Sequence, residues 1–173
     1  MYGHTIFKSH VGDGILDSRI FRQAWGNFAT GVALVTTIEQ DGTVHGMTAN
    51  GVASISLDPM LVMVCVGHKA KTYPIIIDSG RYGINILSEY QEPIGSFYAS
   101  SESETTHEPN TRFHFTESGT AFLDGALSSM DCNVIRHYDE GDHTIFIGEV
   151  ESIEVNSGSP LIFFNSKWGL LAD

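Results

Sequence analysis

The sequence contains little cysteine, little positive charge and no long apolar run, and each shortage excludes a class of protein. The two cysteines, Cys65 and Cys132, lie far apart in apolar segments of the 173-residue chain. We expect buried free thiols in a reducing cytoplasm, with a disulfide between them as the alternative. The longest apolar run, residues 60–66, is too short to cross a bilayer, and no basic segment followed by an apolar stretch opens the chain. We therefore expect neither a signal peptide nor a membrane partner.

Positive charge is scarce: the chain has nine Lys and Arg but 21 Asp and Glu, and its formal net charge is −12. Such a chain repels polyanions, so we expect no nucleic-acid partner. Lys69 and Lys71 form a rare close basic pair, which suits either one anionic ligand or two solvated surface lysines. The sequence also lacks a G-x-G-x-x-G turn after a strand, a P-loop, a G-x-S-x-G elbow and histidines at metal-ligand spacing. These absences disfavour Rossmann, P-loop and α/β-hydrolase chemistry, and we expect no metal site.

The length and the hydrophobic content of 42% fit one domain over residues 17–173, preceded by a flexible arm over residues 1–16. Short apolar runs separated by turn residues predict many strands and hairpins with two or three peripheral helices. We therefore expect a mainly β fold with peripheral helices, an antiparallel barrel that is closed or half open. The expected helices cover residues 17–29, 72–78 and 92–100, and the expected strands cover 32–38, 43–48, 60–66, 81–87, 132–138, 143–155 and 161–165, with a short paired segment at 123–127 and a surface loop at 101–110.

Two of these elements predict particular burial. Phe21, Trp25 and Phe28 follow one another at i, i+4 and i+7, which predicts an aromatic helix face that packs in the core. The helix has Asp17 or Ser18 as its cap, and the following helix has Thr72 as its cap. The run 60–66 is continuously apolar, which predicts a strand buried on both faces.

The most informative stretch is residues 47–59, where small and hydroxyl-bearing side chains occur in place of the bulk of a core strand. Its polar members include Thr48, Asn50, Ser54 and Ser56, and Gly51 allows close backbone approach. Such donors suit a flat polar ligand with a phosphate tail. Two histidines flank the stretch at positions 45 and 68, and we expect both to be exposed turn residues.

A series of short motifs extends in order from about residue 21 to residue 164. They are Phe28–Val32, Gly46–Asn50, Ser54–Pro59, Thr72–Tyr73, Tyr82–Leu87, Gln91–Phe97, Arg112–Phe113, Gly141–Thr144, Ile147–Val150 and Pro160–Leu161. In this order and spacing the chain resembles the short-chain flavin reductases, the small partners of two-component monooxygenases. One departure is Gly51, where that family commonly has a serine, so one hydroxyl contact to the flavin is absent.

The resemblance implies a split β-barrel of the FMN-binding type and a homodimer that binds FMN or FAD near the subunit boundary. Carried over to this chain, Thr48, Ala49 and Asn50 hold the ribityl phosphate, and Lys69 or Lys71 lends it positive charge. The further flavin contacts implied by the resemblance are Ser54 and Ser56 along the flavin, and Ala33, Thr36, Cys65, Val66 and Gly67 around the isoalloxazine. Aromatic residues expected at the subunit boundary are Tyr98, Phe113, Phe115 and Trp168.

His143 begins a strand directly after the Gly141–Asp142 turn. The resemblance places its imidazole beside the nicotinamide, where Asp142 can bias its protonation. The alternative is a strand-initiating histidine bonded to the backbone. Hydride transfer from nicotinamide C4 to flavin N5 needs stacking and orientation, and it requires no acid–base dyad of the protein.

Three functions stay open at this point. The leading one is a cytoplasmic NAD(P)H:flavin oxidoreductase that supplies reduced FMN or FAD to a partner monooxygenase, with NADH favoured over NADPH by the acidic chain. The alternative is a non-enzymatic flavin-binding carrier, which differs only on the nicotinamide side of the site. An oxidase of the pyridoxamine-phosphate type ranks lower, because it needs a second cationic cluster that the sequence lacks.

Overall fold

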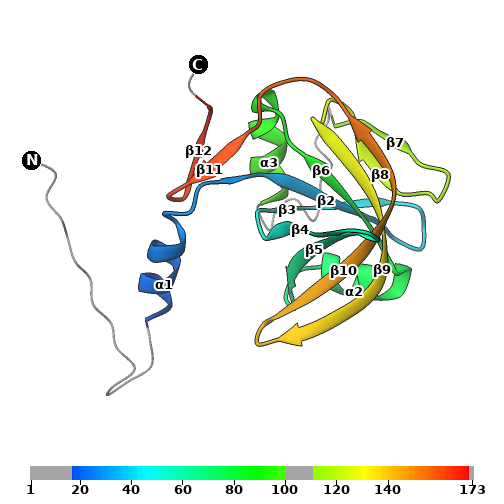
Figure 1. The fold of residues 1–173 in the computed structure, drawn as a ribbon, viewed down its shortest axis with the longest axis horizontal. Helices are drawn as coiled ribbons and strands as arrows, with labels where there is room; N and C mark the ends of the chain where they lie inside the picture. Colours follow the sequence, from blue (N-terminus) through cyan, green and yellow to red (C-terminus); the bar gives the residue numbers. More distant parts are fainter. Residues whose placement is uncertain (1–16, 100–110, 172–173) are drawn as a thin grey trace, which may run out of the picture.

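The computed structural model describes residues 17–99 and 111–171, so the arm expected at 1–16 and the loop expected at 101–110 lie outside the described residues. Its main element is a seven-stranded antiparallel sheet with the strand order β3-β2-β6-β9-β10-β5-β4 (Figure 1). The strands are β2 (Ala33–Ile38), β3 (Val44–Ala49), β4 (Val52–Leu57), β5 (Met60–Gly67), β6 (Arg81–Ile86), β9 (Ser128–Glu140) and β10 (His143–Val155). The prediction of a mainly β, antiparallel fold is confirmed.

The two edge strands of this sheet, β3 and β4, are neighbours in the sequence. β3 ends at Ala49 and β4 begins at Val52, so only Asn50 and Gly51 connect them. Three residue steps span at most about 11 Å, which brings the two edges together at this end. The sheet therefore curves strongly, and irregularities in the pairing of β9 with β10 near Gly148 and Ser152 add to the bend. Within the described ranges no ladder joins β3 to β4, so the sheet is open.

Smaller elements surround the sheet. A three-stranded sheet of β1 (Thr30–Gly31), β11 (Ile162–Phe164) and β12 (Lys167–Gly169) projects from its side together with the first helix, and β7 (Phe113–Phe115) pairs with β8 (Ala121–Leu123) (Figure 1). The helices are α1 (Ser18–Trp25), α2 (Thr72–Ser79) and α3 (Glu92–Tyr98), and a 3-10 turn over Glu89–Gln91 precedes α3. In the described part of the chain, no helix is long and apolar enough to cross a membrane.

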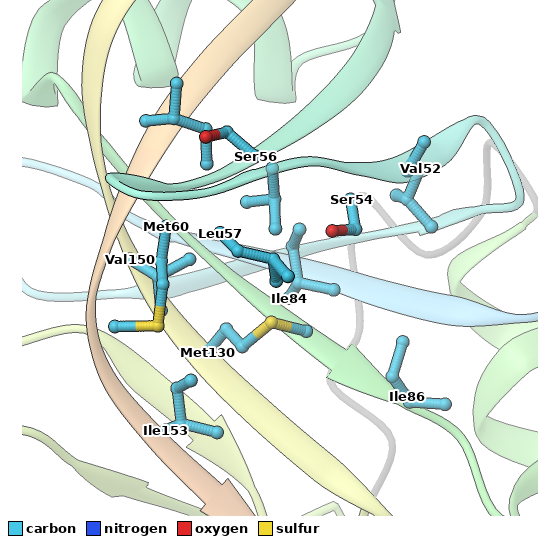
Figure 2. Close-up of a pocket in the computed structure, with 13 residues that line it drawn as sticks. Val52, Ser54, Ser56, Leu57, Met60, Ile84, Ile86, Met130, Val150 and Ile153 are labelled. Carbon is cyan, nitrogen blue, oxygen red and sulfur yellow. The ribbon is translucent and has the colours of Figure 1, made fainter.

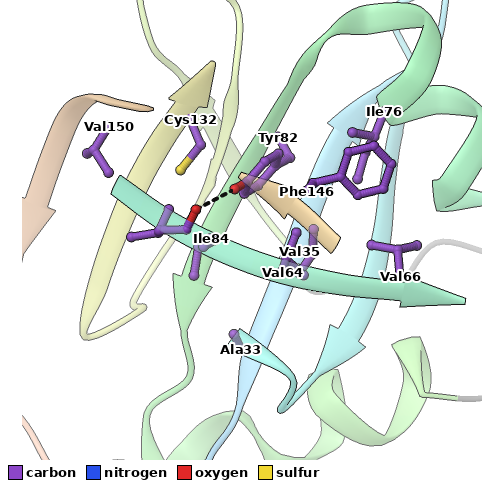
Figure 3. Close-up of a cluster of buried hydrophobic side chains, with 11 residues drawn as sticks. Ala33, Val35, Val64, Val66, Ile76, Tyr82, Ile84, Cys132, Phe146 and Val150 are labelled. Carbon is purple, nitrogen blue, oxygen red and sulfur yellow. Dashed lines mark hydrogen bonds between the residues drawn. The ribbon is translucent and has the colours of Figure 1, made fainter. Parts of the chain in front are cut away.

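The main core cluster is formed by buried side chains of β2, β5, β6, β9 and β10 together with Ile76 of α2 (Figure 3). On β5 the side chains of Val62, Val64 and Val66 are buried, whereas those between them are half-buried. The prediction that this strand is buried on both faces is therefore wrong, because β5 presents only alternate side chains to the core. Tyr82 is fully buried and its hydroxyl donates to the carbonyl of Val62 at 3.4 Å.

Helix α1 differs most from expectation. Asp17 caps it by accepting from the N–H of Arg19 at 2.8 Å, as the cap prediction requires. The helix ends at Trp25, and the stripe of Phe21, Trp25 and Phe28 is 67%, 61% and 62% exposed. The core prediction for this stripe is wrong, because α1 lies beside the small sheet and away from the core of the main sheet (Figure 1).

Other boundaries shift by a few residues. Lys71 occupies the cap of α2, and Thr72 is its first residue, which corrects the predicted cap. The short paired segment lies at Ala121–Leu123 and not at 123–127, since a turn with a left-handed Gly125 follows it. Strands β1, β4, β7 and β12 were not predicted.

Both cysteines are free, so the disulfide alternative is excluded. Cys132 is buried in the core, and Cys65 lies half-buried on β5 on the face opposite to Val66. Burial raises the pKa of both thiols, that of Cys132 to about 12.

Two polar clusters fix the β7–β8 hairpin to the main sheet. The buried carboxylate of Asp131 accepts hydrogen bonds from the hydroxyls of Thr116, Ser118 and Thr120 and from Nη2 of Arg81. Burial opposes ionisation of Asp131, but these bonds outweigh it, so its pKa lies below the usual range. The second cluster is the imidazole of His114 between the carboxylates of Asp124 and Glu154, at 2.8 and 3.0 Å.

The four aromatic residues expected at a subunit boundary differ in how far their side chains are exposed for contact with a second subunit. Tyr98 is only 5% exposed and packs in the second core cluster, which corrects its assignment. Phe113 and Trp168 are half-buried against the same cluster, and Phe115 is exposed.

Candidate functional site

The outer face of β5 and β10 carries a shallow platform near one end of the strands. Gly67 pairs with His143 and Cys65 with Ile145, and directly paired residues share one face of a sheet. This face is opposite to the one that buries Val64 and Val66. The platform, defined as Gly51, Cys65, Gly67, His143 and Ile145, contains two residues without a side chain where β4 and β5 meet.

His143 lies beside Gly67 on the neighbouring strand. A Cβ added to Gly67 would be 3.4 Å from Nε2 of His143, so the imidazole borders the position that a side chain at Gly67 would take. Nδ1 of His143 lies 2.7 Å from Oδ1 of Asp142, and the imidazole is 52% exposed. This hydrogen bond holds the pKa of Asp142 below its usual range, so the carboxylate accepts and Nδ1 of His143 carries the proton. The ring bond therefore goes to Asp142 and not to the backbone.

The turn of Asn50 and Gly51 lies at the same end of the sheet as the platform. The N–H of Cys65 donates to the carbonyl of Gly51 at 2.9 Å, and Gly67 follows two residues later, about 7 Å along the strand. Asn50 is exposed at this turn and Ala49 is half-buried. The sequence order thus brings the expected tail-binding turn close to His143.

A cleft of about 160 Å³ opens beside Asn50. Its wall includes the rings of Phe163 and Trp168, whose centroids lie 5.2 Å apart in an edge-on arrangement. Sequence reasoning missed these two residues as site candidates. No signal in the linear sequence connects them to Asn50, because only the β1-β11-β12 sheet places them there.

The basic pair follows the platform directly. Lys69 and Lys71 are exposed beyond the end of β5, and Lys71 caps α2. They are the cations nearest in sequence to Gly67, and they could neutralise an anionic group at this end of the site.

Thr48 has a structural contact. Its hydroxyl donates to the carbonyl of Gly95 at 2.7 Å and thereby ties β3 to α3. The hydroxyl proton is therefore used within the fold, and the role of Thr48 in holding a phosphate stays a prediction.

Three predicted isoalloxazine neighbours lie in the core. Ala33, Thr36 and Val66 are all 0% exposed. The hydroxyl of Thr36 donates to the carbonyl of Ala121 at 2.6 Å. Their side chains are not exposed on the outer face, and their place around the isoalloxazine stays a prediction.

Ser54 and Ser56 line a different feature, an apolar groove of about 310 Å³ between β4 and the strands β6, β9 and β10 (Figure 2). Ser54 pairs with Val62, five residues along β5 from Gly67, or about 17 Å. The structure therefore does not bring these serines together with His143. The other labelled side chains of the groove are Val52, Leu57, Met60, Ile84, Ile86, Met130, Val150 and Ile153.

The two histidines that flank the motif differ from each other. His45 lies on β3 with its side chain 15% exposed, and its Nδ1 is 3.8 Å from Glu39, so the prediction of an exposed turn residue is wrong there. His68 is exposed after the end of β5, as expected. In the described ranges, no group of three metal-ligating side chains comes together.

The arrangement fits a flat ring with an anionic tail. The glycines at 51 and 67 leave the outer face flat, and the nearest atoms that a Cβ would meet there belong to Cys65 and His143, at 3.4 Å. Burial raises the pKa of the Cys65 thiol, so its sulfur is a neutral, soft neighbour rather than a nucleophile. An exposed amide and two lysines stand at the same end for the tail.

Comparison with known proteins identifies the family of this chain. The model of the flavin reductase like domain matches residues 25–171. The chain belongs to this family. An NADH-dependent flavin reductase of Rhodococcus sp is 40% identical over 149 residues, which is 85% of this chain and 82% of the relative.

Two solved flavin reductases have the same fold. The flavin reductase PheA2 is 40% identical with a TM-score of 0.84, over 91% of this chain and all (100%) of that chain. The styrene monooxygenase flavin reductase SMOB of Pseudomonas putida S12 is 34% identical with a TM-score of 0.80, over 88% of this chain and 97% of its own. The family prediction is confirmed, and an enzymatic flavin reductase is supported over a non-enzymatic carrier.

Proposed function

We propose that this flavin reductase transfers a hydride from NADH to FMN or FAD and releases the reduced flavin to a separate monooxygenase. The observation that carries the proposal is the exposed imidazole of His143 beside Gly67 and the Asn50 turn. The Rhodococcus relative is an NADH-dependent flavin reductase, and SMOB is the flavin reductase of a styrene monooxygenase; the first supports the hydride donor and the second supports the release to a monooxygenase.

The residues of the platform orient the two ligands. When bound, the flavin supplies the hydride acceptor. The flat outer face at Gly51 and Gly67 supports one face of its ring, and His143 borders the position of the nicotinamide. Asp142 holds the imidazole through Nδ1, which leaves Nε2 on the side of Gly67. This preorganised contact positions the nicotinamide without any proton transfer by the protein.

The tail of the flavin is held at the end of the platform, where the Asn50 turn and the two lysines lie. Asn50 offers an exposed amide, Ala49 offers backbone, and Lys69 and Lys71 offer charge. Because Gly51 has no hydroxyl, the hold on the tail is weaker by one hydrogen bond than with a serine there. Moderate affinity suits a flavin that must leave after reduction.

We assign the chain to a split barrel that forms one domain over residues 17–173. The support is the curved seven-stranded sheet, whose edge strands β3 and β4 are connected by the turn of Asn50 and Gly51 and are not paired with each other. The groove under β4 is then the split. The two free thiols agree with a reducing cytoplasm.

We also assign a homodimer, in which the groove under β4 is covered by a second copy. Leu57 is 87% exposed at its rim, and Met60 and Ile153 are about half exposed. A continuous apolar surface of this kind marks an interaction site on a water-exposed protein. Leu57→Asp places a charge there, and we expect sedimentation to report monomers for the variant and dimers for wild type. A wild type that sediments as a monomer would contradict the assignment.

Two variants test the division of the site. His143→Ala should raise KM for NADH and lower kcat/KM by up to about 10²-fold, with flavin affinity close to wild type, because the imidazole meets only the second substrate. Asn50→Ala should instead weaken flavin binding by about 1.5–3 kcal/mol if the amide bonds a charged tail, with little change of turnover at saturating flavin.

The measurements are flavin titration by fluorescence and stopped-flow oxidation of NADH. His137→Ala is the matched control, since His137 is an exposed histidine on β9 near the hairpin tip, and its ring packs on that of Phe146. Equal loss of flavin binding in His143→Ala would place His143 in the flavin pocket. Normal kinetics in that variant would remove it from the site.

A further inference from the structure

His68, the residue that follows β5, holds both chain neighbours of His143. Its backbone N–H donates to the carbonyl of Asp142 at 3.0 Å. Its Nε2 lies 2.9 Å from Oγ1 of Thr144. One residue therefore fixes the backbone before His143 and the side chain after it.

The direction of these hydrogen bonds can be worked out from the partners. The hydroxyl of Thr144 has one proton, and it donates to Oδ1 of Asp139 at 2.6 Å. Oγ1 of Thr144 must then accept from His68, so Nε2 of His68 carries a proton. The result is a relay of His68, Thr144 and Asp139 that connects β5, β10 and β9. Its middle member is 0% exposed, and low local polarity strengthens such bonds.

The relay lies on the opposite side of the strand pair from the platform. Thr144 pairs with Val66, whose face is buried, whereas His143 pairs with Gly67 on the outer face. The ring of His68 packs on Tyr73 with centroids 5.0 Å apart, and Tyr73 packs on the core residue Phe146 at 6.1 Å. Any effect of His68 on the position of His143 is therefore transmitted through the backbone of β10.

We propose that His68 is a positioning residue that sets the position and direction of the His143 imidazole beside Gly67. This inference rests on the proposed role of His143 toward the nicotinamide. A site group is effective when neighbouring packing and hydrogen bonds fix its rotamer and backbone. Here the Asp142 carboxylate fixes the ring of His143, and the relay of His68 fixes the strand end that carries it.

Three variants separate this role from a merely structural one. His68→Leu removes the donor, and Thr144→Val removes its acceptor while it keeps the shape of the side chain. His68→Gln keeps an N–H donor at the end of the side chain and serves as the conservative rescue. We expect the Leu and Val variants to lose about 3- to 10-fold in kcat/KM for NADH, the cost of one hydrogen bond, and the Gln variant to recover most of it. The flavin dissociation constant should stay at the wild-type value in all three.

The decisive measurement is a double-mutant cycle with His143→Ala. If His68 acts through His143, His68→Leu has no further effect on NADH kinetics once the imidazole of His143 is gone. Equal losses in both backgrounds, or a parallel loss of flavin binding, would overturn the inference while the role of His143 stands. If His143→Ala alone leaves NADH kinetics unchanged, the proposed function of His143 fails and the positioning role fails with it. Should His68→Leu unfold, Thr144→Val and His68→Gln complete the cycle, with His137→Leu as the control for an exposed histidine of the same strand pair.

Discussion

Gly67→Ala should separate the stability of this protein from its affinity for flavin. The backbone of Gly67 is not left-handed, so an alanine can adopt its conformation. Loss of glycine from a strand stabilises by about 0.5–1 kcal/mol, because the unfolded chain has fewer states. The new Cβ would lie 3.4 Å from Nε2 of His143, an ordinary contact that needs no rearrangement. We therefore expect an unchanged or raised Tm without ligand.

The same substitution should weaken flavin binding. The methyl group rises from the flat face on which the flavin ring is proposed to lie, and it holds the ring off by a fraction of an ångström to about 1 Å. About twenty carbon contacts contribute about 2–4 kcal/mol of dispersion energy, and such a gap removes a quarter to a half of it. The expected loss of about 0.5–2 kcal/mol raises the flavin Kd by about 2- to 30-fold.

The assay compares Tm by calorimetry with flavin Kd by fluorescence titration. Gly31→Ala is the matched control, because Gly31 lies on β1 and a Cβ there would have nothing within 4 Å. Gly31→Ala should leave Kd unchanged. If Gly67→Ala binds flavin as tightly as wild type and oxidises NADH normally, the ligands do not use this face and the site assignment is wrong.

Three further outcomes follow from the polar and thiol groups. Asp131→Asn should cost about 1.5–3 kcal/mol of unfolding free energy at neutral pH. Because the folded pKa of Asp131 is depressed, the stabilisation by its carboxylate is present above the unfolded pKa and is lost as pH falls through the folded pKa. Urea titrations at decreasing pH would detect this loss. The Asp124 hydrogen bond raises the pKa of His114 despite some desolvation. The contribution of His114 to the free energy of unfolding is therefore full below its unfolded pKa and disappears as pH rises through the folded pKa. Because the side chain is 48% exposed, we expect only about a few tenths of a kcal/mol, and we expect this pH dependence to be absent in His114→Gln. Iodoacetamide should modify Cys65 slowly and Cys132 only after unfolding, and bound flavin should protect Cys65; fast labelling of Cys132 in the native protein would contradict its burial.

Local elements and the family can be predicted from the sequence. The cap at Asp17, the hairpin tip at Gly141 with its left-handed backbone and the long strand from His143 are all local, since turn chemistry and alternation act over a few residues. The ordered motifs are those of a flavin reductase and need no tertiary contact to be identified. The contact of Asp142 with His143 could also be anticipated, because the two residues are adjacent.

The face of the sheet on which each side chain lies depends on strand pairing. Cys65 and Val66 are consecutive, yet one lies on the outer face and the other in the core, because side chains alternate along a strand and the pairing register fixes their sense. Strand pairing across the chain likewise assigned the hydroxyl of Thr48 to Gly95 and buried Thr36.

Long-range placement decided the rest. The amphipathic pattern of α1 predicted an apolar face but not its partner, and in the fold its aromatic stripe is exposed. Trp168 reaches the cleft beside Asn50 through β12, and His68 reaches Thr144 because β5 and β10 are neighbours in the sheet. These contacts join residues dozens of positions apart. Periodicity and propensity describe only neighbours along the chain, so the pairing of the strands alone determines such contacts.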